Sequence, residues 1–134
     1  MTLPVGFPIL AAMFLIPFVT EPIRGNGAKV YRCSSCGALI THSDQLLPIE
    51  GKSRHSFVNP SGIEFDFQSF SSCTGAIALG DATEEHTWFA GYRWRIALCR
   101  SCGLHMGWHY EAVLRSERPR EFWGILLSHL VADR

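Results

Sequence analysis

Large apolar residues recur at every second position in three segments of the chain, where they alternate with other residues. The three sets are Ile63, Phe65 and Phe67; Trp94, Ile96 and Leu98; and Trp108 and Tyr110. A spacing of two places the side chains of each set on one face of a β-strand. The pattern therefore predicts half-buried strands in all three segments and a mainly β fold.

Turn-forming residues mark the ends of further short strands. Residues 30–32 are expected to form a strand that leads into the first cysteine pair, and residues 56–58 another. The second of these strands ends at residues 59–62, whose sequence Asn-Pro-Ser-Gly is typical of a tight turn.

The segments around the central tryptophans and near the C-terminus are assigned from weaker signals. Gly91 predicts a hairpin turn that joins Trp88 and Phe89 to the strand beginning at Tyr92, since glycine tolerates a positive φ. Residues 69–82 carry no clear pattern. Residues 122–131 are mostly apolar and favour a closing strand, although periodicity alone also permits a helix.

The first 28 residues form an apolar segment and a linker ahead of the domain predicted for residues 29–134. The apolar run of residues 7–19 is shorter than the roughly 20 residues that a membrane-spanning helix needs. It is either a loosely ordered N-terminus or part of a secretory signal peptide, and no lysine or arginine precedes it, as a signal would normally require. We therefore expect a cytoplasmic protein without a membrane span, or a secreted one if residues 1–20 act as a signal.

The composition is that of one globular domain. The chain has 134 residues, of which 47% are hydrophobic and 18% charged, enough apolar material for one core. Twelve Lys and Arg residues balance 12 Asp and Glu residues, so the formal net charge is +0. Proteins that bind duplex nucleic acid usually carry a surplus of positive charge. We therefore expect no nucleic-acid partner.

Four of the five cysteines lie in two matching turns, in which Cys33 and Cys36 form one pair and Cys99 and Cys102 the other. Zinc prefers a tetrahedron of thiolates, and two such turns supply four. Each pair is followed by a glycine, which lets the backbone bend back so that N–H groups point at the sulfurs. A four-cysteine site leaves no position open for a substrate. We predict one structural zinc ion; a thiol-redox pair is the weaker alternative, because the two turns match.

Three of the four tryptophans, Trp88, Trp94 and Trp108, fall close together in the sequence, with Tyr110 just beyond them. Two interpretations are open from this pattern. The rings would pack into an ordinary core, since aromatic residues dominate cores. Alternatively, they would line a narrow slot in which a flat, compact ligand buries most of its surface and is hydrogen-bonded at its ends by the backbone and His86.

Seven motifs of this chain, taken in their order and spacing, resemble the thalidomide-binding (CULT) domain of the cereblon family. They are Cys33-x-x-Cys36-Gly37, Leu46-Leu47-Pro48, Asn59-Pro60-x-Gly62, His86-x-Trp88-Phe89-x-Gly91-Tyr92-x-Trp94, Cys99-x-x-Cys102, Gly107-Trp108-x-Tyr110 and Phe122-Trp123-Gly124. The resemblance covers the chain from about Ala28 to the C-terminus and is closest to the small single-domain bacterial forms. It implies a β-tent, in which two antiparallel sheets meet at an angle and are pinned by a four-cysteine zinc site.

The resemblance also implies a binding site. Trp88, Trp94 and Trp108 would form a three-tryptophan cage that Tyr110 closes. The resemblance further implies that the His86 ring and the Trp88 backbone hydrogen-bond the ligand. It also implies that Asn59 lies on the rim of the site and Phe89 beside the cage. The implied ligand is a cyclic imide: a glutarimide or succinimide ring, a thalidomide-type drug, or the cyclised C-terminal Asn or Gln of a damaged protein. The chain has no room for the Lon-like domain and ubiquitin-ligase adaptor region of full-length cereblon, so the resemblance implies the binding module alone.

Two other functions remain as alternatives. A methionine-sulfoxide-reductase-like oxidoreductase on a similar fold would need a redox cysteine, for which only Cys73 is free; we expect Cys73 to be a buried small hydrophobe. A cage for methylated ammonium would use Glu84, Glu85 or Glu111 as its charged partner.

The histidines give no sign of catalysis. His86, His105 and His109 have no nucleophile partner at a diagnostic spacing, so we expect a binding protein and not an enzyme. His109 should face away from Trp108 and Tyr110. The remaining three, His42, His55 and His129, are expected at the surface.

Overall fold

The computed structural model describes residues 27–133, and the expectations for the apolar N-terminal segment lie outside that range. The described residues form nine β-strands and two short 3-10 helices, and none of them lies in an α-helix. In chain order these are β1 Val30–Cys33, β2 Leu39–His42, η1 Ser43–Gln45, β3 Arg54–Val58, β4 Glu64–Phe70, β5 Ala76–Thr83, β6 Tyr92–Cys99, β7 His105–Ala112, β8 Glu121–Leu126, η2 Leu127–His129 and β9 Leu130–Asp133. The mainly β prediction is confirmed.

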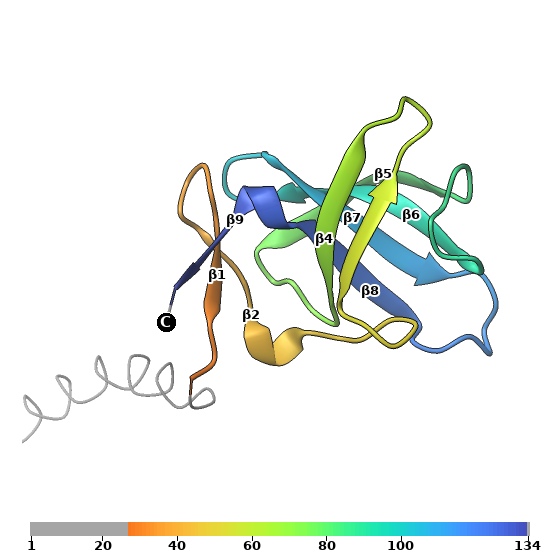
Figure 1. The fold of residues 1–134 in the computed structure, drawn as a ribbon, viewed down its shortest axis with the longest axis horizontal. Coiled ribbons are helices and arrows are strands. Elements are labelled where there is room, and N and C mark those ends of the chain that lie inside the picture. The colour runs from red at the N-terminus through yellow and green to blue at the C-terminus, as the bar shows by residue number, and fades with distance from the viewer. Residues whose placement is uncertain (1–26, 134) are drawn as a thin grey trace, which may run out of the picture.

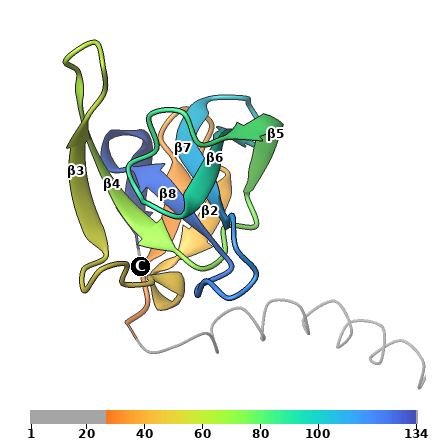
Figure 2. The same ribbon diagram turned by 90° about the vertical axis from the view of Figure 1, so that its right-hand side faces the viewer.

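The strands form two antiparallel sheets (Figures 1 and 2). The small sheet has the order β2-β1-β9 and the large sheet the order β3-β4-β8-β7-β6-β5. The chain enters the large sheet after η1 and returns to the small sheet through η2, so the first and last described strands pair with each other. The two antiparallel sheets expected for a β-tent are confirmed.

The large sheet is buried on both faces, and each face has its own core. On one face Phe70 and Ile125 of the large sheet share a cluster of buried residues with Tyr31 and Ile40 of the small sheet. The opposite face carries an aromatic core. Its buried members include Phe67, Phe89, Trp108, Tyr110 and Phe122. One core therefore joins the sheets, and the other supports the pocket described below.

The segment before β6 differs from the predicted hairpin. Trp88 and Phe89 lie in a loop between Thr83 and Tyr92, and β6 pairs instead with β5, which falls in the segment that showed no pattern. The turn at Gly91 is present, with a φ of 92° and a hydrogen bond from the Tyr92 N–H to the Phe89 carbonyl. The predicted hairpin is wrong: Trp88 and Phe89 lie in a loop, and the Phe89 side chain is buried in the aromatic core.

The apolar segment of residues 122–131 is strand, as favoured, but it is not one strand. The short helix η2 divides it into β8 of the large sheet and β9 of the small sheet. A second difference concerns His55, which was expected at the surface. Its side chain is buried, with a relative exposure of 2%, because it packs against the rings of Phe57, Phe67 and Phe89.

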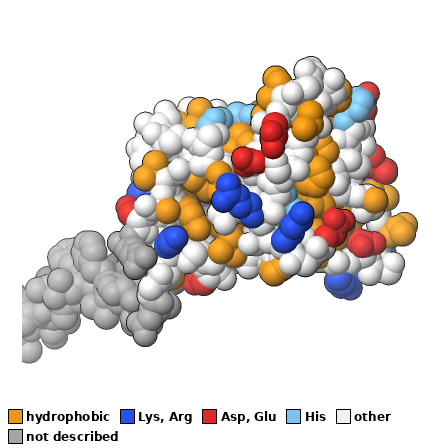
Figure 3. Space-filling view, in the orientation of Figure 1, with side chains coloured by type: hydrophobic (Ala, Val, Ile, Leu, Met, Phe, Trp, Pro, Cys, Tyr) orange, Lys and Arg blue, Asp and Glu red, His pale blue; other side chains and the backbone are white. Residues whose placement is uncertain are grey.

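One face of the molecule carries charges of both signs. Figure 3 shows basic and acidic side chains interspersed over one face of the molecule. In the part of the chain that the structure describes, no helix is long and apolar enough to cross a membrane.

Candidate metal centre and aromatic pocket

The four cysteines of the two matching turns come together in space. Their sulfur atoms all lie within 4.8 Å of one another, and the Cys33–Cys102 and Cys36–Cys99 sulfur pairs are each 3.7 Å apart. A tetrahedron with zinc–sulfur bonds of about 2.3 Å has edges of about 3.8 Å. Two of the sulfur pairs match this spacing, and all four sulfurs lie close enough together to hold one zinc ion.

Both turns have the same backbone geometry. The N–H of Gly37 donates to the carbonyl of Cys33, and the N–H of Gly103 donates to that of Cys99, each at 2.9 Å. The two glycines have φ angles of 79° and 83°, which are strained for residues with a side chain. The first turn joins β1 to β2 in the small sheet and the second joins β6 to β7 in the large sheet. A metal bound here pins the two sheets together.

The surroundings of the thiols set their charge before metal binds. Burial raises the pKa of Cys33 to about 11, although N–H groups of Cys36 and Ser35 act in the opposite direction. At the exposed Cys36, a hydrogen bond from the Ala38 N–H lowers the pKa of the thiol to about 7. A bound cation would favour the thiolate form at both positions.

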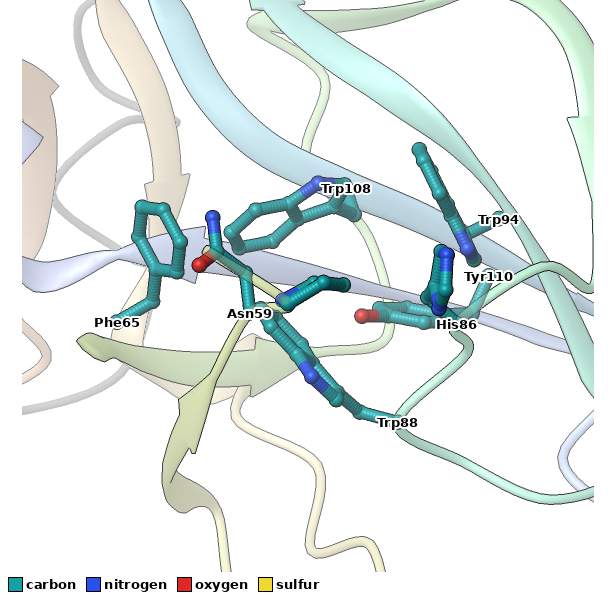
Figure 4. A pocket seen from close by; sticks show the side chains of 8 residues that line it. Asn59, Phe65, His86, Trp88, Trp94, Trp108 and Tyr110 are labelled. Atoms are coloured by element: carbon teal, nitrogen blue, oxygen red, sulfur yellow. The ribbon is translucent and has the colours of Figure 1, made fainter. Parts of the chain in front are cut away.

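A cavity of about 250 Å³ opens on the aromatic face of the large sheet. The residues that line it come from the β3–β4 turn, from β4, from the loop between β5 and β6, and from β6 and β7. They are Asn59, Pro60, Phe65, His86, Trp88, Trp94, Trp108 and Tyr110. Figure 4 shows Trp88 and Trp108 on two sides of the space and Tyr110 between them. The cavity is open, so these rings do not collapse into a closed core.

Aromatic packing behind the cavity holds its walls in place. The Trp88 ring stacks on Phe57 at a centroid distance of 5.3 Å and an angle of 8°, and on Phe67 at 5.8 Å and 19°. The Trp108 ring meets Trp88 edge-to-face at 5.0 Å and Phe65 at 5.4 Å. Such pairs each contribute about 1 kcal/mol beyond the burial of their surface. The walls are therefore largely preformed.

The loop that bears His86 and Trp88 is anchored at several points. The indole N–H of Trp94 on β6 donates to the carbonyl of Glu85 at 2.9 Å, and the Thr87 N–H donates to the carbonyl of Glu84. Phe89 packs edge-to-face against Tyr110 at 5.0 Å. These contacts hold the loop across the end of the cavity although its first half is exposed.

Few polar groups face the cavity, and some are already used. The Asn59 carbonyl oxygen accepts hydrogen bonds from the N–H groups of Ser61 and Ile63, at 3.0 and 2.9 Å. Its amide nitrogen is therefore the part of this side chain that a ligand would meet. At Tyr110, burial raises the pKa of the phenol, so the hydroxyl stays neutral.

Six of the seven residues predicted for the ligand site line this cavity; Phe89 does not. The Phe89 side chain is 1% exposed and lies in the core behind Tyr110. The sequence analysis did not assign Pro60 and Phe65 to the site. The sequence placed Pro60 in the turn after Asn59 and Phe65 in the alternating strand. Neither pattern, however, indicates contact with a ligand.

The other candidates lie elsewhere. Cys73 is 3% exposed in the core between the sheets, as expected for a small hydrophobe, and burial raises the pKa of its thiol. It does not line the cavity, which removes support for a reductase. His109 faces away from the cavity, as predicted, and its Nε2 lies 2.7 Å from the Glu121 carboxylate.

Comparison with known proteins agrees with this geometry. A family model described as "Yippee zinc-binding/DNA-binding /Mis18, centromere assembly" matches residues 29–130. Cereblon of Gallus gallus is 40% identical over 76 residues, which cover 57% of this chain and 17% of that protein. Cereblon of Drosophila willistoni is 30% identical over 103 residues, covering 72% of this chain and 16% of that protein. The chain thus matches less than a fifth of the length of these relatives.

A solved structure shares the fold. The crystal structure of a Mis18 "Yippee-like" domain superposes with a TM-score of 0.55, covering 80% of this chain and 96% of that one at 11% sequence identity. Fold and metal site together define a zinc-binding domain of two pinned β-sheets. The chain belongs to the Yippee/Mis18 family, and its domain is of the cereblon type. The prediction of one zinc ion on four cysteines is confirmed.

Proposed function

We propose that this domain is a binding module for cyclic imides, and that Trp88, Trp94 and Trp108 form the cage that holds the ring. The observation that carries the proposal is the open cavity of about 250 Å³ among these three indoles, on a domain of the cereblon type. The ligand class comes from the resemblance to the thalidomide-binding domain.

The chemistry of the cavity suits a small flat ring with one polar edge. An imide has an N–H donor between two carbonyl acceptors, and the rest of a glutarimide or succinimide ring is apolar. Indole faces would contact the ring, while His86 and the backbone of Trp88 would bind the imide edge. Asn59, whose amide N–H groups are available at the rim, would donate to a substituent outside the cage. Each buried imide group left without a partner would cost roughly 1–3 kcal/mol.

The experiment is a titration of zinc-loaded protein with glutarimide, followed by tryptophan fluorescence and by calorimetry. We expect saturable quenching, because the ligand would lie against three indoles. Trp94→Ala should abolish binding. The matched control is Trp123→Phe, since Trp123 follows Phe122 on β8 and so lies on the opposite face of the sheet, where it packs on His109 at 4.4 Å.

The outcomes separate the proposal from its rival. Absence of binding at millimolar glutarimide in folded, zinc-loaded protein would count against the imide proposal. Saturable binding of trimethyl-lysine in preference to glutarimide would favour a cage for methylated ammonium instead.

A further inference from the structure

The loop between β7 and β8, residues 113–120, concentrates positive charge in a chain whose net charge is +0. Its sequence is Val-Leu-Arg-Ser-Glu-Arg-Pro-Arg, which contains three arginines and one acid. The arginines, Arg115, Arg118 and Arg120, are all exposed. Figure 1 shows the loop at the right-hand end of the molecule, opposite β1 and β9. None of its residues lines the aromatic cavity, so this surface is separate from the proposed imide site.

The positive charge of this loop is available to a partner. Among the described residues, none of the three loop arginines forms an ion pair, whereas Arg93 and Arg95 both pair with Glu111. The one acid of the loop, Glu117, is half-buried. Its carboxylate lies beside Gly91, 3.7 Å from the position that a Cβ atom there would occupy. The acid therefore faces the body of the domain, and the cations face solvent.

Hydrogen bonds hold the loop in one shape. The Tyr92 hydroxyl donates to the carbonyl of Pro119 at 2.7 Å and so ties the loop to β6. The Arg118 guanidinium donates to the carbonyls of Arg115 and Glu117, at 2.7 and 3.0 Å. A partner would meet a surface that is already formed, so little conformational entropy is lost on binding.

An exposed leucine lies beside these charges. Leu114 is 62% exposed, the highest value for any large hydrophobic residue between positions 27 and 133. Its carbonyl accepts hydrogen bonds from the Glu117 N–H and from the Arg120 guanidinium, which fixes the backbone and keeps the side chain at the surface. An apolar side chain flanked by cations suits the boundary between the headgroups and the acyl chains of a lipid bilayer.

We propose that residues 113–120 dock this domain on an anionic phospholipid surface, with Leu114 at the acyl boundary and the three arginines among the headgroup phosphates. Nucleic acid would use the arginines but would give Leu114 no role. A stable protein–protein interface buries about 800 Å² on each partner, more than an eight-residue loop offers. A bilayer requires only shallow insertion beside several charges, and the resulting binding is weak and reversible.

The test is flotation of the full, zinc-loaded chain with two kinds of vesicle: phosphatidylcholine alone, and an equal mixture of phosphatidylcholine and phosphatidylserine. Leu114→Ser removes the apolar contact. Arg115→Gln removes a charge whose side chain forms no hydrogen bond with the described residues. The matched controls are Leu79→Ser, at a leucine on β5 that is 56% exposed, and Arg54→Gln, at an exposed arginine on β3 with no ion pair among the described residues.

We expect wild type to bind the mixed vesicles at least about tenfold more tightly than phosphatidylcholine alone, and added salt to weaken that binding. Leu114→Ser should weaken binding about tenfold, because the leucine is no longer withdrawn from water. Arg115→Gln should weaken it about fivefold, the effect of one cation near an anionic membrane. Both controls should bind as wild type does, and all four variants should retain zinc.

Three outcomes would overturn the proposal. The first is equal binding to both kinds of vesicle, and the second is wild-type binding by Leu114→Ser. The third is binding to single-stranded DNA that competes with the vesicles and that Arg115→Gln weakens but Leu114→Ser does not, which would identify a nucleic-acid surface instead. Each of these outcomes leaves the imide proposal standing, because the loop does not line the aromatic cavity.

Discussion

His86 has a backbone conformation that residues with a side chain rarely adopt. Its φ is 58°, in the left-handed region, where most such residues carry a cost of about 1–2 kcal/mol. Its imidazole is 61% exposed at the rim of the cavity and lies 3.8 Å from the Glu85 carboxylate. Strained, exposed residues of this kind cluster at binding sites. The ring lies at the cavity, where the proposed function places the imide edge.

Behind the cavity, His55 is held in its neutral form. Its Nε2 lies 3.2 Å from the Ser69 hydroxyl, which itself donates to the carbonyl of Leu47 at 2.6 Å. His55 therefore donates through Nε2, and its buried Nδ1 has no partner. Burial lowers the pKa of His55, and the charge of Lys52 lowers it further, while Glu50 opposes the shift. Adding a proton would place a positive charge among phenylalanine rings.

We therefore expect stability to fall at acid pH. Below the usual histidine pKa of about 6.5, His55 binds a proton in the unfolded chain but stays neutral in the folded protein. The free energy of unfolding therefore falls as pH decreases, by up to about 1.4 kcal/mol per pH unit. Burial also lowers the pKa of His105, which adds to the slope. His55→Phe should make the slope between pH 7 and pH 5 shallower, measured by urea denaturation.

The control for this measurement is Tyr92→Phe, which removes a hydroxyl but no histidine and should keep the wild-type slope. Identical slopes in His55→Phe and wild type would show that His55 does not link folding to pH. The burial of His55 was missed because its immediate neighbours Arg54 and Ser56 are polar, and two of the three rings that cover it, those of Phe67 and Phe89, come from other segments. The resemblance to the thalidomide-binding domain, and not the aromatic spacing alone, indicated which residues line the cavity, but it did not indicate that the Phe89 side chain lies in the core.

At the level of elements, the pocket depends on a loop and not on a hairpin. β5 runs along the edge of the large sheet, and its register shifts between Leu79 and Thr83, so it lacks a clean alternation. Gly80 interrupts it with a φ of 84°. This is why the strand left no pattern in the sequence, whereas β4, β6 and β7, which face a core, were predictable from their spacing of two.

The start of β5 meets the small sheet at Gly75, and this contact has no room for a side chain. A Cβ atom at Gly75 would lie 1.9 Å from the carbonyl oxygen of Leu39 and 2.7 Å from the Cα of Ile40. Both are backbone atoms of β2. We expect Gly75→Ala to force the sheets apart and lower the free energy of unfolding by at least about 2 kcal/mol, measured by urea denaturation.

Gly80→Ala is the matched control, since no atom lies within 4 Å of its Cβ position and only the backbone strain of about 1 kcal/mol remains. If Gly75→Ala proves no more destabilising than Gly80→Ala, the close approach of β2 to β5 is not needed for stability.

At the scale of the whole molecule, the metal site and the pocket share one hairpin. The Cys99–Cys102 turn connects β6, which carries Trp94, to β7, which carries Trp108 and Tyr110. Matching cysteine turns made the zinc site predictable, because ligand chemistry is local in sequence. The order of the strands was not predictable, since β4 pairs with β8 through backbone hydrogen bonds between segments that are far apart in the chain. The wall of the cavity formed by Phe65 depends on that pairing and could not be assigned beforehand.

Loss of the metal should therefore affect both stability and ligand binding. Cys102→Ser removes one thiolate, and we expect the variant to lose zinc and to unfold at a temperature lower by more than about 20 °C, because a structural zinc contributes several kcal/mol of folding free energy.

Acid should weaken zinc binding in wild type, since protons compete for the thiolates. Burial raises the pKa of Cys33 to about 11, so zinc binding at pH 8 should release the proton of this thiol. Metal analysis, thermal denaturation and proton release in weak buffer measure these effects.

Cys73→Ala, which removes a cysteine outside the metal cluster, should still hold one zinc ion per chain. A Cys102→Ser protein that retained zinc and the wild-type melting temperature would show that the sheets are held together without the fourth thiolate.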